Sequence, residues 1–293
     1  MKNLHRSRIS MKISENTLGI IFVLPFIFFF IFFVISPLIE EISLSFYEAK
    51  IGTEHKFIGI KNFITLASSL DYNRALINTA LYVGIAVNIK LALALLIANY
   101  LNKDFKGRTI VEILFLLPWA IPTVSALLNF RWILDTDMGI INQILSEIGL
   151  SKVKWLSQYE TAMFSIIMFH IWKWLPFWTV IFLGGIKSIP RELYEACSID
   201  GGDIWKTFRF ITLPLIKPLY IICILLSTIW TMGDFNTVYV LTGGGPAQTT
   251  NVLATLAYRY AFFVGDFGMA SSIITFILPI VLILLLLLFR MIK

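Results

Sequence analysis

Polar groups and aromatic rings crowd one short stretch of the chain, at the end of a long apolar run. Aromatic rings can stack on the C–H face of a sugar, while carboxylate and amide groups bond its hydroxyl groups. The stretch is therefore a candidate carbohydrate-binding site. Two alternatives stay open: the hydroxyl residues could bond across a helix–helix interface, and the carboxylate could lie at the membrane surface. The six residues are Ser227, Trp230, Thr231, Asp234, Phe235 and Asn236.

The sequence contains no set of residues that would make the chain an enzyme. A phosphate-cradling P-loop needs Gly-Lys followed by Ser or Thr, and this tripeptide occurs nowhere in the chain. The two cysteines and three histidines are scattered, without the spacing of metal ligands. We therefore predict no catalytic residue, no metal site and no cofactor bound by this chain, so that any ATP hydrolysis would need separate subunits.

Other charged residues interrupt apolar runs, where a charge facing lipid costs roughly 2.5–3.5 kcal/mol. Glu112 follows Arg108 by four residues, so an ion pair within one helix is expected. Structural pairing is also our interpretation of Lys90. His170 and Lys173 lie in a tryptophan-rich run, and this lysine could snorkel to the interface or face a polar cavity.

The elements that must position these residues are membrane-spanning helices. Hydrophobic residues make up 58% of the 293 positions and charged residues 14%, which is too apolar for a soluble domain of this length. A run of about 18 or more apolar residues can cross a hydrocarbon core of about 30 Å. We predict an all-α, polytopic membrane protein with six transmembrane helices, at about 18–39, 76–100, 109–130, 160–184, 212–233 and 268–290.

The chain reads as one membrane domain behind a short polar segment. We assign residues 1–17 to a cytoplasmic N-terminal segment and 18–293 to the transmembrane domain. The first span is too long for a removable signal and is expected to remain as a helix. Two prolines in the first span and two in the third predict kinks that neighbouring helices can tolerate. They are Pro25, Pro37, Pro118 and Pro122.

Basic residues set the expected orientation, because they are retained on the cytoplasmic side of the spans they flank. With both termini inside, the cytoplasmic segments hold more than half of the 24 basic residues and a third of the 18 acidic ones. The net charge of +6 is then mainly a topology signal, and nothing indicates nucleic-acid binding. We expect a multi-pass protein of the cell membrane.

The longest cytoplasmic segment, about 185–211, can form two short helices. Pro190 suits the first turn of a helix, and Ser188 can cap that helix. The glycine pair that begins at Gly201 would end it, since glycine accepts a positive φ. Asp203 can then cap a second short helix.

The register of residues in this segment resembles the EAA loop of ABC-importer permeases. In that family the loop docks into the ATPase subunit and carries its motion into the membrane. Cys197 replaces the second alanine of the pattern and Gly202 the alanine after Asp-Gly, and both remain small. The alternative is an ordinary loop on lipid headgroups. By resemblance, the ATPase-coupling residues are Glu195, Ala196, Asp200, Gly201, Gly202, Phe208, Ile211, Leu213 and Pro214, and the register ends at Pro218.

Two outer segments resemble the same permeases. Residues 239–246 are similar to a Leu-Thr-Gly-Gly-Pro stretch of carbohydrate-type ABC permeases, in the maltose and glycerol-3-phosphate group and the first-permease class. Residues 57–63 resemble that class too. Glycines allow a sharp turn and a close approach to a neighbour, although a tight loop without a partner is the alternative. The residues expected to contact the binding protein or partner permease are Gly243, Gly244, Gly245 and Pro246.

The resemblance implies a permease subunit of an ABC type I importer. It implies a heterodimer with a second homologous permease, two ATPase subunits that hold ATP and Mg, and an extracytoplasmic solute-binding protein. A sugar, oligosaccharide or glycerol-phosphate-like polyol would be moved by alternating access. The rival hypotheses are an ABC permease for a non-sugar solute and an ion-coupled secondary transporter. The latter predicts broken helices in two inverted halves, for which the sequence gives no sign.

Overall fold

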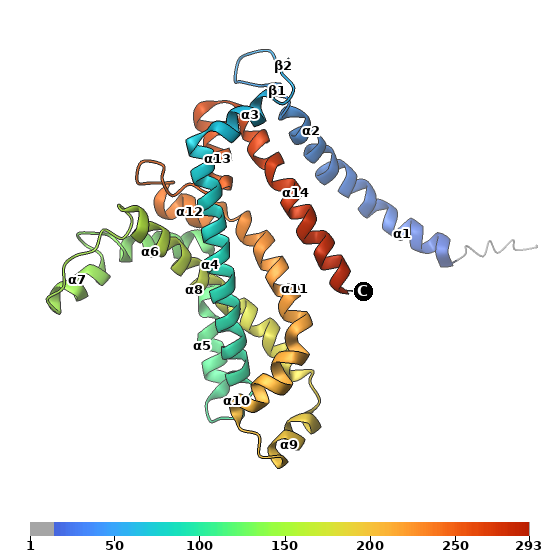
Figure 1. Ribbon diagram of the computed structural model, residues 1–293, viewed down its shortest axis with the longest axis vertical. Helices are drawn as coiled ribbons and strands as arrows, with labels where there is room; N and C mark the ends of the chain where they lie inside the picture. Colours follow the sequence, from blue (N-terminus) through green and yellow to red (C-terminus); the bar gives the residue numbers. More distant parts are fainter. Residues whose placement is uncertain (1–14, 293) are drawn as a thin grey trace, which may run out of the picture.

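The computed structural model describes residues 15–292, and most of them are helical (Figure 1). Five helices are long and apolar enough to cross a membrane, or six if one bent pair is counted as a single span. The all-α membrane fold is therefore confirmed. The predicted segment 1–17 lies almost entirely outside the described residues.

The five long helices coincide with five of the predicted spans and extend beyond them at one or both ends. Local caps explain part of the extension: Ser69 accepts a hydrogen bond from the backbone N–H of Tyr72 at 3.3 Å and starts its helix six residues before the expected position. The long helices are α1–η1–α2 (Glu15–Phe30, Ile31–Ile35, Ser36–Leu44), α4 (Leu70–Leu101), α8 (Tyr159–Lys187), α10–η2–α11 (Ile204–Thr207, Phe208–Thr212, Leu213–Met232) and α14 (Phe267–Ile292).

The third predicted span is broken rather than kinked. It consists of α5 (Arg108–Ala120) and α6 (Thr123–Ile133), which meet at an angle of 91°. Pro122 has no N–H to donate and disfavours a helical conformation at Ile121, whose backbone is extended. The predicted kink in the span at 109–130 is therefore a full break, and the span consists of two helices rather than one.

Lys173 of α8 stabilises this break. Its ammonium group donates to the carbonyl oxygens of Pro118 and Trp119 at 3.0 and 3.1 Å, and also to that of Ile121. The last carbonyls of a helix have no partner within the helix, and the lysine supplies one. Lys173 is buried, so the expectation that it snorkels or faces a polar cavity is wrong.

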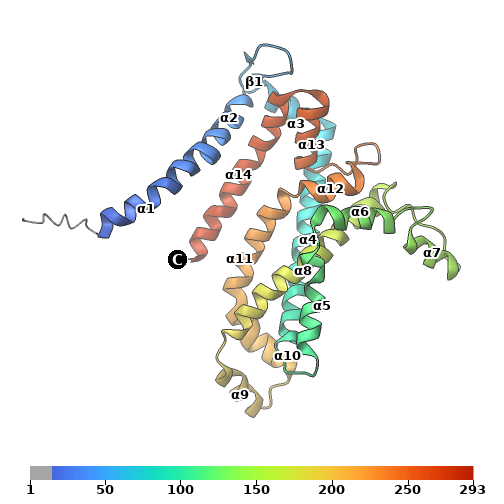
Figure 2. The same cartoon turned by 180° about the vertical axis from the view of Figure 1, so that it is seen from behind.

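The core lies between α4 and α8, which make the most extensive contact in the molecule, with α11 alongside (Figures 1 and 2). Small residues of α4 such as Ala94 and Ala98 allow close approach, and Trp178 and Phe182 of α8 fill the space against them. Small residues are what lets helices associate closely in a membrane, where lipid is as apolar as the side chains.

Two of the long helices contain a π turn just before a proline. The turn η1 precedes Pro37, and η2 precedes Pro214. In each, the residue before the proline bonds to the carbonyl five residues back rather than four, and the proline itself has no N–H to restore the α-helical pattern. The first and fifth spans thus continue through these turns as single helices.

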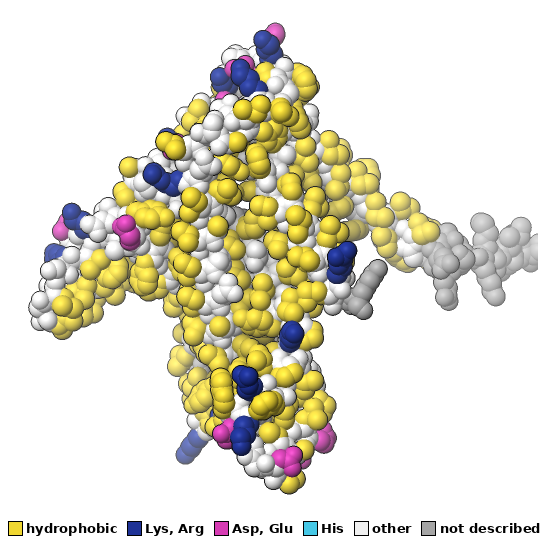
Figure 3. All heavy atoms as spheres, viewed as in Figure 1, with side chains coloured by type: hydrophobic (Ala, Val, Ile, Leu, Met, Phe, Trp, Pro, Cys, Tyr) yellow, Lys and Arg dark blue, Asp and Glu magenta, His cyan; other side chains and the backbone are white. Residues whose placement is uncertain are grey.

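The first helix leans away from the bundle, and only its α2 end lies against α14 (Figures 1 and 2). None of the residues in its most hydrophobic stretch is buried. Figure 3 shows a similar apolar surface over the centre of the molecule, with most of the charged side chains at the upper end and around α9–α10 at the lower end.

Short elements connect the long helices. A short amphipathic helix, α7, follows the broken third span, and the chain between the first two spans forms a two-stranded antiparallel hairpin followed by α3. The short elements are β1 (Tyr47–Glu48), β2 (Lys56–Phe57), α3 (Lys61–Ser68), α7 (Ile140–Glu147), α9 (Arg191–Ile199), α12 (Phe235–Thr242), α13 (Leu253–Arg259) and η3 (Tyr260–Val264).

Candidate functional site

The six residues of the predicted polar and aromatic stretch line a single cavity of about 250 Å³. It lies where α11 ends and α12 begins. Two other helices, α4 and α8, complete the wall with Lys90, His170, Trp174 and Trp178. We call it the inner cavity.

Asp234 occupies the break between α11 and α12. Its carboxylate caps α12 by accepting hydrogen bonds from the backbone N–H and the hydroxyl group of Thr237, at 3.1 and 2.6 Å. The side chain is 14% exposed. The carboxylate is therefore mostly buried and bonded within the protein.

A network of four ionisable side chains builds one wall of the inner cavity: three of them line it, and Tyr82 lies behind them. Tyr82 donates to Asp234 Oδ2 at 2.7 Å, and His170 Nδ1 lies 2.9 Å from the same oxygen. The other ring nitrogen of His170, Nε2, lies 2.9 Å from Lys90 Nζ. A proton on Nδ1 satisfies both contacts, since Nε2 then accepts from the ammonium group. The expected structural pairing of Lys90 is therefore with His170.

Ser227 is also buried at the inner cavity, but its hydroxyl group is not part of the network. Its Oγ forms no hydrogen bond within residues 15–292, although buried hydroxyl groups are normally paired. Trp230 lies beside it in α11, and its ring contacts the rings of Trp178 and Phe177, each at 5.7 Å between centroids. The inner cavity thus offers an unpaired hydroxyl next to aromatic faces.

Sequence reasoning missed Tyr82 and Asn78 of α4. The Asn78 amide donates to the backbone oxygens of Thr249 and Asn251 at 2.7 and 2.8 Å and accepts from Tyr159 at 2.9 Å. A signal was present: Asn78, Tyr82 and Lys90 are spaced by multiples of four, which aligns polar side chains on one helix face.

The loop that contains Gly243, Gly244, Gly245 and Pro246 folds back on itself. Gly243 and Gly244 have φ values of +60° and +83°, in the left-handed region that favours glycine. A Cβ atom on Gly244 would overlap the Asn251 amide. Thr250 closes the turn by donating to the Gly245 oxygen at 2.6 Å. The loop is therefore a rigid shape fixed to α4 through Asn78.

The segment that resembles an EAA loop forms two short helices at the lower end of the molecule (Figure 1). Asp203 caps the second one by accepting from the Lys206 N–H at 2.7 Å, as predicted. Ser188 does not cap α9; its hydroxyl group bonds the Gly185 oxygen at the end of α8 because that helix runs on to Lys187.

The predicted coupling residues divide into an exposed group and an anchored group. Glu195, Ala196, Asp200 and Gly201 are exposed at the tip, and Leu213 and Pro214 are exposed in the first turn of α11. Ile211 and Gly202 are half-buried. Phe208 is buried in the core between α4, α8 and α11. Its packing anchors the two short helices to these long helices.

Two departures from the EAA pattern meet at this tip. Gly201 has a φ of +74°, which fits the expected helix end. A Cβ atom on Gly202 would overlap both Sγ and the backbone oxygen of Cys197. The Cys197 side chain, which is larger than the alanine of the pattern, thus occupies the space left by the absence of a side chain at Gly202.

The remaining expectations concern ion pairs and metals. Arg108 Nε donates to Glu112 Oε1 at 2.8 Å, which confirms the predicted pair. Within the described part of the chain, no group of three or more His, Cys, Asp or Glu side chains could hold a metal ion.

Residues 90–292 match the family described as binding-protein-dependent transport system inner membrane component. The chain belongs to this family. This permease is 35% identical over 271 residues to the trehalose/maltose transport system permease protein MalF of Thermococcus litoralis, with 92% of each chain covered. It is 28% identical to the sulfoquinovosyl glycerol transport system permease protein SmoG of Agrobacterium fabrum, over 90% of this chain and 86% of the relative.

The fold of the permease is also that of a solved structure. A chain of a bacterial alginate ABC transporter, in complex with an alginate pentasaccharide-bound periplasmic protein, superposes with a TM-score of 0.83 at 27% identity. The match covers 94% of this chain and 93% of that one.

Family membership makes the permease a multi-pass inner membrane subunit of an ABC importer, with a transport role rather than a catalytic one.

Proposed function

We propose that the permease imports a carbohydrate and that the inner cavity forms part of the path. The observation that carries the proposal is one small cavity that combines indole rings in contact, the unpaired Ser227 hydroxyl group and the Asp234 and Asn236 side chains. Rings supply faces for sugar C–H groups, and the polar groups supply hydroxyl partners. At about 250 Å³ the space suits one sugar ring, since drug-sized ligands occupy about 300–1,000 Å³.

The relatives support this class of solute. Their printed names refer to trehalose or maltose and to sulfoquinovosyl glycerol, and the related structure belongs to an alginate transporter. These solutes differ in charge but share hydroxyl-bearing rings, which is the chemistry that the inner cavity fits.

A matched pair of tryptophan variants tests the path. Trp230→Leu removes a ring from the inner cavity, whereas Trp132→Leu removes a ring of α6 that is 78% exposed and lies outside it. Sugar uptake by vesicles containing the assembled transporter should fall at least several-fold for the first and stay near wild type for the second. Equal uptake by both variants would contradict the proposal.

We further propose that α9 and α10 dock into an ATPase subunit that holds ATP and Mg. Support comes from apolar side chains at the tip: Ile199 and Trp205 are 86% and 63% exposed, and Leu193 is 42% exposed. Such side chains, surrounded by charged residues, are typical of a protein interface. The assembly would contain two ATPases, a second homologous permease and a binding protein.

Copurification tests this docking. Glu195→Lys or Gly201→Asp should reduce the amount of ATPase recovered with the tagged permease. Glu192→Lys makes the same charge change on the same helix outside the EAA register and serves as the control. Loss of ATPase from the control alone, or from none, would count against a specific docking site.

We propose that both termini and α9–α10 lie in the cytoplasm and the 243–246 loop lies outside, where it would meet the binding protein or the second permease. Single cysteines test this after Cys197→Ala, because Cys223 is buried. In intact cells a membrane-impermeant thiol reagent should label Gln248→Cys and not Lys206→Cys. The opposite labelling pattern would invert the topology.

A further inference from the structure

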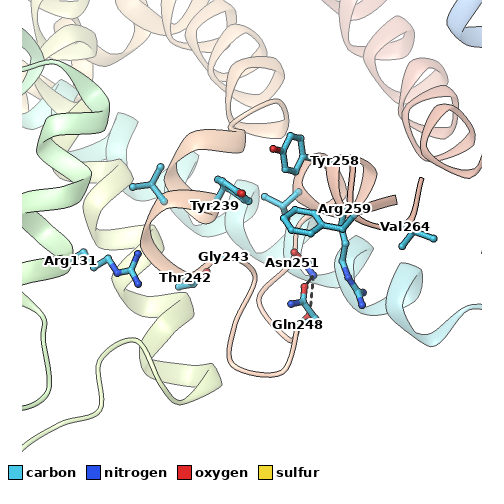
Figure 4. A pocket seen from close by; sticks show the side chains of 12 residues that line it. Arg131, Tyr239, Thr242, Gly243, Gln248, Asn251, Tyr258, Arg259 and Val264 are labelled. Carbon is cyan, nitrogen blue, oxygen red and sulfur yellow. Dashed lines mark hydrogen bonds between the residues drawn. The ribbon is translucent and has the colours of Figure 1, made fainter. Parts of the chain in front are cut away.

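A second and larger cavity, of about 760 Å³, opens between α6, α12 and α13 (Figure 4). Its lining combines aromatic rings, amides and guanidinium groups. Figure 4 shows Arg131 on one side and Arg259 on the other, with Tyr239 and Tyr258 between the two sides. We call it the outer cavity, because the proposed orientation puts it on the outer side of the inner cavity.

Aromatic rings connect the two cavities without a gap. Phe235 lines the inner cavity, and its ring lies 4.7 Å from Tyr239 and 4.8 Å from Tyr258 between centroids. Tyr239 and Tyr258 both line the outer cavity and lie 5.1 Å from each other. These separations are within the range of direct ring contact. The rings that line the two cavities therefore belong to one cluster of contacting rings.

The polar lining of the outer cavity consists of hydrogen-bond donors and amides, with no carboxylate among its lining residues. Arg131 forms no salt bridge within residues 15–292, and Arg259 has only a long one, 3.5 Å to the half-exposed Asp71. The cavity floor is rigid: Asn251 is buried and donates to Gln248 Oε1 at 2.8 Å. Guanidinium groups can reach sugar hydroxyl or carboxylate oxygens with several donors each.

We propose that the outer cavity is a second sugar subsite, which holds the next ring of an oligosaccharide while the inner cavity holds the first. Tyr258 and Tyr239 provide the stacking surface, and the two arginines bind oxygens at its sides. The inference rests on the proposed carbohydrate function and adds a requirement: the outer subsite matters only for a solute long enough to occupy both cavities.

Chain length is therefore the decisive variable. The probes are two series of one to four units, one of α-1,4-linked glucose and one of a uronic acid. Each is offered to vesicles of the complete transporter with its binding protein saturated, so that binding-protein affinity cancels. Tyr258→Leu should lower the uptake rate of the two-, three- and four-unit probes by about two- to ten-fold, from a stacking contribution of 0.5–1.5 kcal/mol, and leave the single sugar unchanged.

Three controls separate this inference from a general loss of function. Tyr258→Phe keeps the ring and should keep wild-type rates at every length. Tyr100→Leu removes an exposed ring of α4 outside both cavities and should change nothing. Trp230→Leu, in the inner cavity, should slow every length. A Tyr258→Leu effect that is absent, or equal at all lengths, overturns the outer subsite alone. Failure of the wild-type transporter to import any sugar of either series overturns the carbohydrate function and this inference with it.

Discussion

At the scale of single residues, the contact between Cys197 and Gly202 shows how two departures from a family pattern compensate. The EAA pattern has alanine at both positions, so the residue found at either position is not explained by that position alone. In this fold the thiol occupies the space that a Cβ atom at 202 would need. The two residues therefore form one packing unit between α9 and α10.

We expect Gly202→Ala to distort the tip, at a cost of about 1–3 kcal/mol for overpacking, and to reduce the ATPase that copurifies with the permease. Cys197→Ala alone should have little effect. The double variant should recover part of the loss, because removing Sγ leaves only the overlap with the backbone oxygen. The recovered amounts of ATPase for the four proteins form a double-mutant cycle; strict additivity would show that the two residues do not interact.

Asp234 is the second residue whose role depends on partners from other helices. Asp234→Ala leaves Lys90 and His170 buried without their acidic partner, and breaking a buried pair in this way costs about 3–5 kcal/mol. We expect a large drop in the fraction of folded, monodisperse complex that survives heating. Adding Lys90→Met should restore part of this folded fraction. Asp71→Asn breaks an exposed pair and should lower the free energy of unfolding by less than about 1 kcal/mol, so its folded fraction should stay near wild type.

At the scale of elements, the broken α5–α6 span depends on a side chain from another helix. Lys173→Met removes the donor for three carbonyl oxygens, and each buried acceptor left unsatisfied costs about 1–3 kcal/mol. We expect lower heat resistance of the complex and a changed distance between labels on α5 and α6, measured by spin labelling. Lys217→Met, at an exposed lysine of α11, is the control, and equal behaviour of the two variants would refute the role of Lys173.

The π turn before Pro214 makes a second element-scale prediction. One extra residue in a turn offsets the helix by about 100°, since an α-helix has 3.6 residues per turn. Pro214→Ala restores an N–H group and permits the α-helical pattern, which would rotate α9–α10 relative to α11. We expect more ATP hydrolysed per sugar imported, measured in the same vesicles. An unchanged ratio would mean that the π turn has no part in coupling.

At the scale of the whole molecule, the features that follow from local sequence were predictable. Apolar run length is a local property, so the helices at 70–101, 159–187 and 267–292 were found. The inner cavity was found through six residues that lie within one short stretch, 227–236. Tyr82 was not, because its bond to Asp234 joins residues 152 positions apart, and helix spacing reveals a polar face without revealing what it faces.

The break in the third span was only half predictable for the same reason. Pro118 and Pro122 indicated a weak point in the sequence, but the 91° angle depends on where α8 places an ammonium group. A proline shows where a helix can bend; the tertiary partner decides how far.

The Lys90–His170–Asp234 wall has a consequence for bioenergetics. One formally cationic and one formally anionic group are joined through an imidazole, so their charges cancel within a single connected unit. Each net charge moved across the bilayer would couple to the membrane voltage by about 2.3 kcal/mol per 100 mV. Rearrangement of a wall with no formal net charge adds almost nothing of this kind, so imposing a membrane potential on vesicles supplied with ATP should leave the rate of sugar import unchanged.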